Sequence, residues 1–228
     1  MSKIAVSRPP SERTGMPQLG GRRFSASVFL VCVGLLSAAS RAIAHHALGG
    51  KIPANLLEGF VSGLAHPIIG LDHFAFIVAV GLLAVGLSRG ALIPAGFILT
   101  ALAGTAIHLL KLDLPGSEII IAGSAIAFGV MLLLQQRPNF IALTAIAAFA
   151  GVFHGYAYGE SIVGAQMTPL VSYLLGFSLI QYAIALLALL IGNWTKKKFT
   201  RPNFSPMQFA GFVICSIGTV FLTSSLLG

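Results

Sequence analysis

Long apolar runs dominate the chain from residue 68 onward, and Pro, Gly or charged residues separate each run from the next. They cover Ile68–Leu87, Ala91–Leu110, Ser117–Leu134, Asn139–Tyr158, Pro169–Ile191 and Met207–Leu227. An α-helix needs about 20 apolar residues to cross the hydrocarbon core of a bilayer, and each run is close to that length. The runs are too long and continuous for barrel strands, in which apolar and polar residues alternate. The pattern predicts an all-α, polytopic membrane bundle of about six transmembrane helices, forming one domain over residues 45–228.

The start of the chain has the pattern of an export signal. A polar, basic stretch is followed by the apolar segment Phe24–Ala39, and Ala42 and Ala44 are small residues at the positions that a signal peptidase reads. We therefore predict a signal peptide over residues 1–44, so that the mature chain opens with two histidines. Retention of the segment as a seventh helix is the alternative.

Composition and charge indicate a lipid environment and argue against nucleic-acid binding. Hydrophobic residues make up 56% of the chain and charged residues only 9%, whereas soluble domains carry roughly 25% charged residues. The formal net charge is +8, but the basic residues are concentrated near the N-terminus and in one loop after the fifth apolar run. That distribution is typical of membrane topology and not of a surface that binds phosphates.

The basic residues also predict an orientation. If the mature N-terminus lies outside, the loops after the first, third and fifth helices face the cytoplasm. Those loops hold Arg89, Arg137, Lys196, Lys197, Lys198 and Arg201, whereas the outer segments hold Lys51 and Lys111. An excess of Lys and Arg on the cytoplasmic side is the positive-inside rule. We expect a multi-pass protein of the bacterial inner membrane with its mature N-terminus outside.

All histidines and acidic residues that follow the signal fall on the predicted outer side. Asp72 and His73 lie inside the first apolar run, where an Asp costs about 2.5–3.5 kcal/mol on insertion, so a bound cation or a buried partner must offset that cost. His66 precedes His73 by seven residues, which places both on one face of a single helix, and Pro67 suits the first turn of that helix. These residues indicate a metal site, and side-chain pairing that fixes helix packing is the alternative.

Three further residues extend the set of candidate metal ligands. His154 lies on the fourth helix and shares a face with Tyr158. Glu160 follows at the outer end of that helix, and His108 closes the second helix on the outside; polar residues are ordinary at helix ends, so a surface role is the alternative for these two. Imidazole nitrogens combined with carboxylate oxygens suit nickel, cobalt or zinc. The metal would be the substrate, and no resident cofactor is predicted.

Two segments resemble the signatures of a known family. His66-Pro67-Ile68-Ile69-Gly70-Leu71-Asp72-His73 resembles HPxxGxDH, a signature of the HupE/UreJ membrane proteins encoded with hydrogenase and urease accessory genes. Phe153-His154-Gly155-Tyr156-Ala157-Tyr158-Gly159-Glu160 resembles the second signature, FHGxAxGxE, with Tyr158 where members often have a further His and Glu160 directly after Gly159. The resemblance implies secondary transport of nickel or cobalt, with metalloenzyme maturation proteins as partners. The ligands that it implies are His66, Asp72, His73, His154 and Glu160.

A metal-ion permease is the function that these features favour. The chain has no GxxxxGK[ST] P-loop, so it is not expected to hydrolyse ATP, and the membrane potential would drive the cation inward. The alternative is an accessory protein that holds or senses metal for metalloenzyme maturation. An enzyme is not expected, because HExxH is absent and Ser124 is predicted to lie toward mid-membrane with no histidine at its depth. Nothing in the sequence sets the oligomeric state.

Overall fold

The computed structural model describes residues 51–198 and 205–227, and every regular element in these stretches is an α-helix. The helices are α2 (Leu56–Ile69), α3 (Leu71–Leu83), α4 (Leu92–Leu109), α5 (Ser117–Leu134), α6 (Phe140–Glu160), α7 (Met167–Lys198) and α8 (Pro206–Leu227). By length and composition, helices α4 to α8 are each long and apolar enough to cross a membrane, and the number rises to six when the bent pair α2 and α3 is counted as one span. The predicted all-α membrane bundle is confirmed. The predicted signal peptide, His45 and His46 lie outside the described residues.

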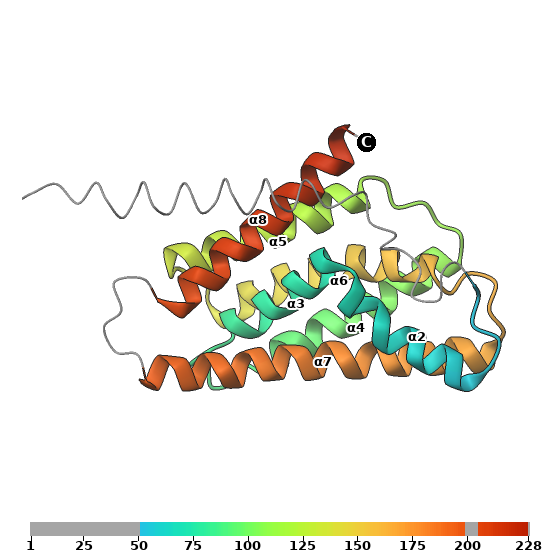
Figure 1. Cartoon of the computed structure of the whole chain (residues 1–228), viewed down its shortest axis with the longest axis horizontal. Coiled ribbons are helices and arrows are strands. Elements are labelled where there is room, and N and C mark those ends of the chain that lie inside the picture. The colour runs from blue at the N-terminus through green and yellow to red at the C-terminus, as the bar shows by residue number, and fades with distance from the viewer. Residues whose placement is uncertain (1–50, 199–204, 228) are drawn as a thin grey trace, which may run out of the picture.

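The helices are arranged around α3. Helix α2 lies along α7, α4 packs on α6, and α5 crosses α8, while α3 runs between them through the middle of the bundle (Figure 1). Glycines bring the backbones of α4 and α6 together: a Cβ atom on Gly155 would overlap the carbonyl oxygen of Ala101, and one on Gly104 would overlap that of Val152. Small residues allow such close contacts between membrane helices.

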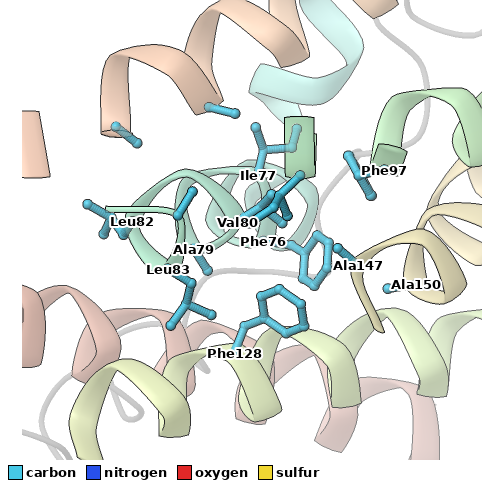
Figure 2. Close-up of a cluster of buried hydrophobic side chains, with 14 of the residues drawn as sticks. Phe76, Ile77, Ala79, Val80, Leu82, Leu83, Phe97, Phe128, Ala147 and Ala150 are labelled. Atoms are coloured by element: carbon cyan, nitrogen blue, oxygen red, sulfur yellow. The ribbon is translucent and has the colours of Figure 1, made fainter. Parts of the chain in front are cut away.

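The centre of the bundle is aromatic. The ring of Phe76 on α3 lies 4.6 Å from that of Phe128 on α5 and 5.3 Å from that of Phe97 on α4, between centroids. Figure 2 shows these three rings meeting beside the small side chains of α6. We call Phe76, Phe97 and Phe128 the phenylalanine cluster. Helix α3 is apolar on nearly every side because it is surrounded by other helices instead of water.

The first predicted span differs from the structure. We expected one helix over Ile68–Leu87 with Pro67 in its first turn, but α2 and α3 meet at Gly70 with a bend of 80°. Pro67 lies near the end of α2, not in a first turn. His66 and His73 therefore do not share a face of one helix, and the bend sets their relative position.

Local sequence explains where these two helices begin and end. Asn55 caps α2 by accepting a hydrogen bond from the backbone N–H of Glu58 at 2.9 Å, and the Glu58 carboxylate accepts one from the Ala54 N–H at 2.8 Å. Pro67 lacks the N–H that would continue the helical ladder. Gly70 then adopts an extended conformation with ψ of 97°, which ends α2 and starts α3.

Helix α7 is longer than predicted. We expected a helix over Pro169–Ile191 followed by a loop, but α7 continues through Gly192, which packs against Val85 beyond α3, and ends at Lys198. Its last turn holds three lysines, whose positive charges are favourable at the C-terminal end of a helix dipole. The predicted bounds of α4, α5, α6 and α8 agree with the structure within two residues.

Basic side chains gather at one end of the bundle, which we call the lysine end after Lys196, Lys197 and Lys198. Arg137 donates from Nη1 to the backbone carbonyls of Leu83 and Val85, at the C-terminal end of α3. The side chain of Lys196 approaches Gly86, in the turn that follows α3. Since α3 ends here, His73 in its first turn lies toward the opposite end of the bundle.

Candidate functional site

Three histidines from different helices meet inside the bundle. His66 of α2, His73 of α3 and His154 of α6 are all buried. The ring centroids of His66 and His73 are 6.1 Å apart, and those of His73 and His154 are 5.0 Å apart. The bend at Gly70 turns the end of α2 and the start of α3 toward the same point. We call these three residues the histidine cluster.

His154 has a hydrogen-bond partner at each ring nitrogen. Its Nδ1 lies 2.9 Å from Nδ1 of His73, and its Nε2 lies 3.1 Å from Oγ of Ser124. The Ser124 hydroxyl donates to the Ile121 carbonyl at 2.7 Å, so it accepts from His154. With both rings neutral, His154 then accepts at Nδ1 from the Nδ1–H of His73. This assignment leaves the lone pair of His73 on Nε2, the form in which a histidine binds metal.

The prediction for Ser124 was wrong. We expected no histidine at its depth, but it contacts His154 directly. Because its proton goes to the Ile121 carbonyl, Ser124 is arranged as an acceptor and not as a nucleophile activated by a base. It fixes the tautomer and the orientation of His154, which in turn orients His73. Hydrogen bonds of this kind position the ligands of metal sites.

His66 is held by a second set of hydrogen bonds. Its Nδ1 lies 2.5 Å from Oγ of Ser161, which directly follows α6. Ser161 also contacts the hydroxyl of Tyr173 at 3.4 Å, and that hydroxyl donates to the Tyr158 carbonyl at 3.0 Å. The ring of His66 is therefore fixed against both α6 and α7.

Tyr158 completes the site, although the sequence indicated it only as a departure from the family signature on the same face as His154. Its side chain is fully buried, with ring centroids 4.5 Å from His73 and 5.1 Å from His66. Its hydroxyl is buried and has no hydrogen-bond partner among the described residues. Leaving such a group unpaired costs about 1–3 kcal/mol. A ligand that contacts this hydroxyl would recover that cost.

The position of Asp72 explains how a carboxylate is accommodated within an apolar run. Asp72 is half-buried in the first turn of α3, and its Oδ1 accepts a hydrogen bond from the His73 N–H at 2.9 Å. The N-terminal end of a helix stabilises a negative charge. The break at Gly70 creates that helix end inside the span, so the bend offsets part of the cost that the sequence indicated.

Two of the candidate ligands lie apart from the cluster. His108, near the end of α4, is half-buried and its ring lies 4.5 Å from that of Tyr156, whereas Glu160 is exposed as the last residue of α6. Nδ1 of His108 is buried with no hydrogen-bond partner in the described part of the chain. We call His108 and Glu160 the rim pair. The structure does not bring either into contact with the histidine cluster.

The site is an open donor set and not a closed cage. Across residues 51–198 and 205–227, no group of three or more His, Cys, Asp or Glu side chains is spaced to hold a metal ion. What the centre offers is the imidazoles of His66 and His73 and the hydroxyl of Tyr158, with Asp72 in the adjoining turn. A small set of nitrogen and oxygen donors suits a borderline divalent cation.

Comparison with known proteins adds the family. The model of the HupE / UreJ protein family matches residues 33–221, a range that includes both histidine-containing segments. The chain belongs to the HupE/UreJ family. Protein HupE of Rhizobium leguminosarum bv. viciae is 27% identical over 122 residues, which cover 53% of this chain and 63% of that protein. No solved structure matches the chain.

Family membership confirms the assignment made from the two signatures, and it agrees with the multi-pass membrane fold. In the second signature, Tyr158 stands at a position where family members often have a further His. In the structure Tyr158 contacts both His66 and His73, so the residue that departs from the signature lies inside the site.

Proposed function

We propose that this HupE/UreJ protein is a permease that takes up divalent nickel or cobalt across the bacterial inner membrane. The observation that carries the proposal is the burial of His66, His73 and the unpartnered Tyr158 hydroxyl at a break in a membrane span. Secondary transporters commonly place their ion sites at such discontinuous helices, where helix ends and side chains replace the water around the ion.

In the proposed mechanism the cation enters from the end opposite the lysine end. Asp72, half-buried and charged, attracts it, and Nε2 of His73 binds it together with His66. His154 and Ser124 hold His73 in the required tautomer without binding the ion themselves. An inside-negative membrane potential favours inward movement of a divalent cation by about 4.6 kcal/mol per 100 mV, twice the value for a single charge.

The proposed orientation places the lysine end in the cytoplasm. Arg137 and Lys196 meet around Gly86 there, which supports a shared basic side for the loops that hold them. The positive-inside rule assigns that side to the cytoplasm. Cysteines introduced singly near Lys196 and near Lys111 test this: only the second should react with an impermeant maleimide in intact cells, and the reverse labelling pattern would contradict the orientation.

Metal accumulation in cells tests the proposal. Cells that lack their own nickel and cobalt uptake systems would express the wild-type chain, Asp72→Ala, His73→Ala or His108→Ala at equal membrane abundance. We expect wild type and His108→Ala to accumulate one of the labelled metals and the other two variants to stay at background. Background accumulation by the wild type for both metals would overturn the proposal.

One observation favours a second function, that of an accessory protein which holds metal without transporting it. The ring of Phe76 stacks on His154 with centroids 4.4 Å apart, so the phenylalanine cluster directly adjoins the histidine cluster. A holder would need no movement of these rings, whereas a permease must open a way past them. Purified protein that binds metal in cells that accumulate none would support the holder.

A further inference from the structure

Gln181 is a buried polar residue that makes no contact assigned to the candidate site. It lies on α7, and its side chain is fully buried. Its Nε2 donates to the Phe177 carbonyl at 3.1 Å, which also fixes which end of the amide is the oxygen, because two carbonyl oxygens would repel each other. That oxygen, Oε1, is buried and has no hydrogen-bond partner among residues 51–198 and 205–227.

The neighbouring turns of α7 show which way Gln181 faces. One turn before it, the ring of Phe177 lies 4.9 Å from that of Tyr158. One turn after it, the Ala185 carbonyl would overlap a Cβ atom on Gly81 of α3. Residues four apart share a helix face, so Gln181 lies on the face that α7 turns toward α3. It lies about 6 Å beyond Phe177 along α7, on the way to the lysine end.

Two buried oxygens without hydrogen-bond partners in the described structure are thus found near this face, one on α6 and one on α7. The first is the Tyr158 hydroxyl beside His66 and His73, the second is Gln181 Oε1, and Phe177 separates them. A buried amide oxygen without a hydrogen-bond partner brings no advantage in packing, because an apolar side chain of the same shape would avoid the unmade hydrogen bond. A cation that loses part of its hydration shell needs such oxygens.

We propose that Gln181 is a second, inner binding position for the transported divalent cation, reached after the histidine cluster. Its amide oxygen contacts the ion directly or through one of the waters that the ion retains. Because the amide is neutral, it holds a cation more weakly than imidazole with carboxylate, as suits the last stop before release to the cytoplasm. This inference rests on the proposed permease function, and it gives the cation a donor between the histidine cluster and the lysine end.

The test separates binding from passage. Gln181→Leu keeps the size of the side chain and removes the oxygen, and Gln181→Glu keeps an oxygen at the same place. Gln208→Leu is the matched control, because both ends of the Gln208 amide are hydrogen-bonded, Oε1 to the Ser205 N–H at 3.0 Å and Nε2 to the Leu133 carbonyl at 3.1 Å. Initial uptake rates in cells and equilibrium binding of nickel and cobalt to purified protein would be measured for all three and for wild type.

We expect Gln181→Leu to bind metal like wild type but to take it up about tenfold more slowly, a change of about 1.4 kcal/mol in the barrier. Gln181→Glu should recover much of the rate, and Gln208→Leu should transport normally. Wild-type uptake by Gln181→Leu would overturn the inference while leaving the permease intact. Equal loss of binding and uptake in both Gln181 variants would also overturn it, since it would indicate a structural role. No uptake by the wild type would defeat the permease and the inference together.

Discussion

The histidine cluster and the rim pair differ in burial and in the contacts of their side chains, although both carry polar residues that the sequence marked as candidate ligands. His66, His73 and His154 are buried and their rings lie close to one another, whereas Glu160 is exposed and His108 is half-buried beside Tyr156. Matching a signature therefore does not make a residue part of the central site. The helix break at Gly70 and the burial of each side chain determine which candidate residues lie in the histidine cluster.

The largest difference between the two regions should appear on removal of the central imidazole. His73→Ala deletes the ring that touches His154 and Tyr158, so we expect metal uptake to fall to background. Uptake of labelled nickel and cobalt at equal membrane abundance measures it. Thermal unfolding of the purified variant is the control. A folded His73→Ala protein that transports at the wild-type rate would show that the histidine cluster is not needed for uptake.

The next largest effect is expected on metal affinity when the hydrogen bond between Ser124 and His154 is removed. Ser124→Ala leaves the Nε2–H of His154 without its acceptor, so His73 loses the orientation that His154 provides. Loss of such partners in metal sites costs about 10–100-fold in affinity. Calorimetric titration with the transported metal checks the value. Ser124→Thr keeps a hydroxyl and should bind nearly as well as wild type; unchanged affinity in Ser124→Ala would show that His73 needs no such support.

A smaller effect is expected from Tyr158→Phe, which removes only the hydroxyl. Uptake should fall severalfold if that oxygen contacts the ion, while the protein becomes no less stable, because the hydroxyl has no partner in the described structure. Uptake rate and thermal midpoint would be measured together. The matched control is Tyr173→Phe, whose hydroxyl donates to the Tyr158 carbonyl and should cost stability. Loss of stability without loss of uptake in Tyr158→Phe would place the ion elsewhere.

The smallest effects belong to the rim pair. His108→Ala and Glu160→Gln should change initial uptake by less than about twofold, because neither side chain contacts the histidine cluster and exposed charges contribute little. Rates at low and saturating metal would be compared with wild type. A tenfold lower uptake rate in either variant would show that the rim pair contributes to transport as the histidine cluster does. It would indicate that the rim pair forms an entry site for the cation.

Most of the fold could be predicted from hydropathy, and the exceptions have physical reasons. The bounds of α5 were predicted to the residue because Gly116 and the polar Gln135 frame a segment that is apolar from Ile119 to Leu134 except for Ser124. Helix α2 was missed because Glu58, Gly59 and Gly63 interrupt its hydropathy; in the structure the two glycines pack against the backbone of α7. Local caps set the ends of that helix, and its packing on α7 stabilises a segment that hydropathy alone did not indicate.

The residues of the candidate site could be selected from the sequence, but the contacts among them could not. His66, Asp72, His73 and His154 could be selected because ionisable residues within apolar runs are costly. The contacts of Ser124 with His154 and of Ser161 with His66 depend on how distant helices pack, and no spacing along the chain reveals them. Gln181 was missed for a further reason: one uncharged amide barely lowers the hydropathy of a helix as apolar as α7.

Reconstitution of the purified chain in lipid vesicles shows whether the protein itself moves metal across a membrane. The wild-type protein would be placed in lipid vesicles that contain a metal-sensitive dye, and nickel or cobalt would be added outside under an imposed inside-negative potential. We expect dye quenching that depends on the potential and is absent from vesicles with His73→Ala. If the wild-type protein binds metal but no metal enters the vesicles with or without the inside-negative potential, the permease function is contradicted. The chain would then be a membrane protein that holds metal but does not move it.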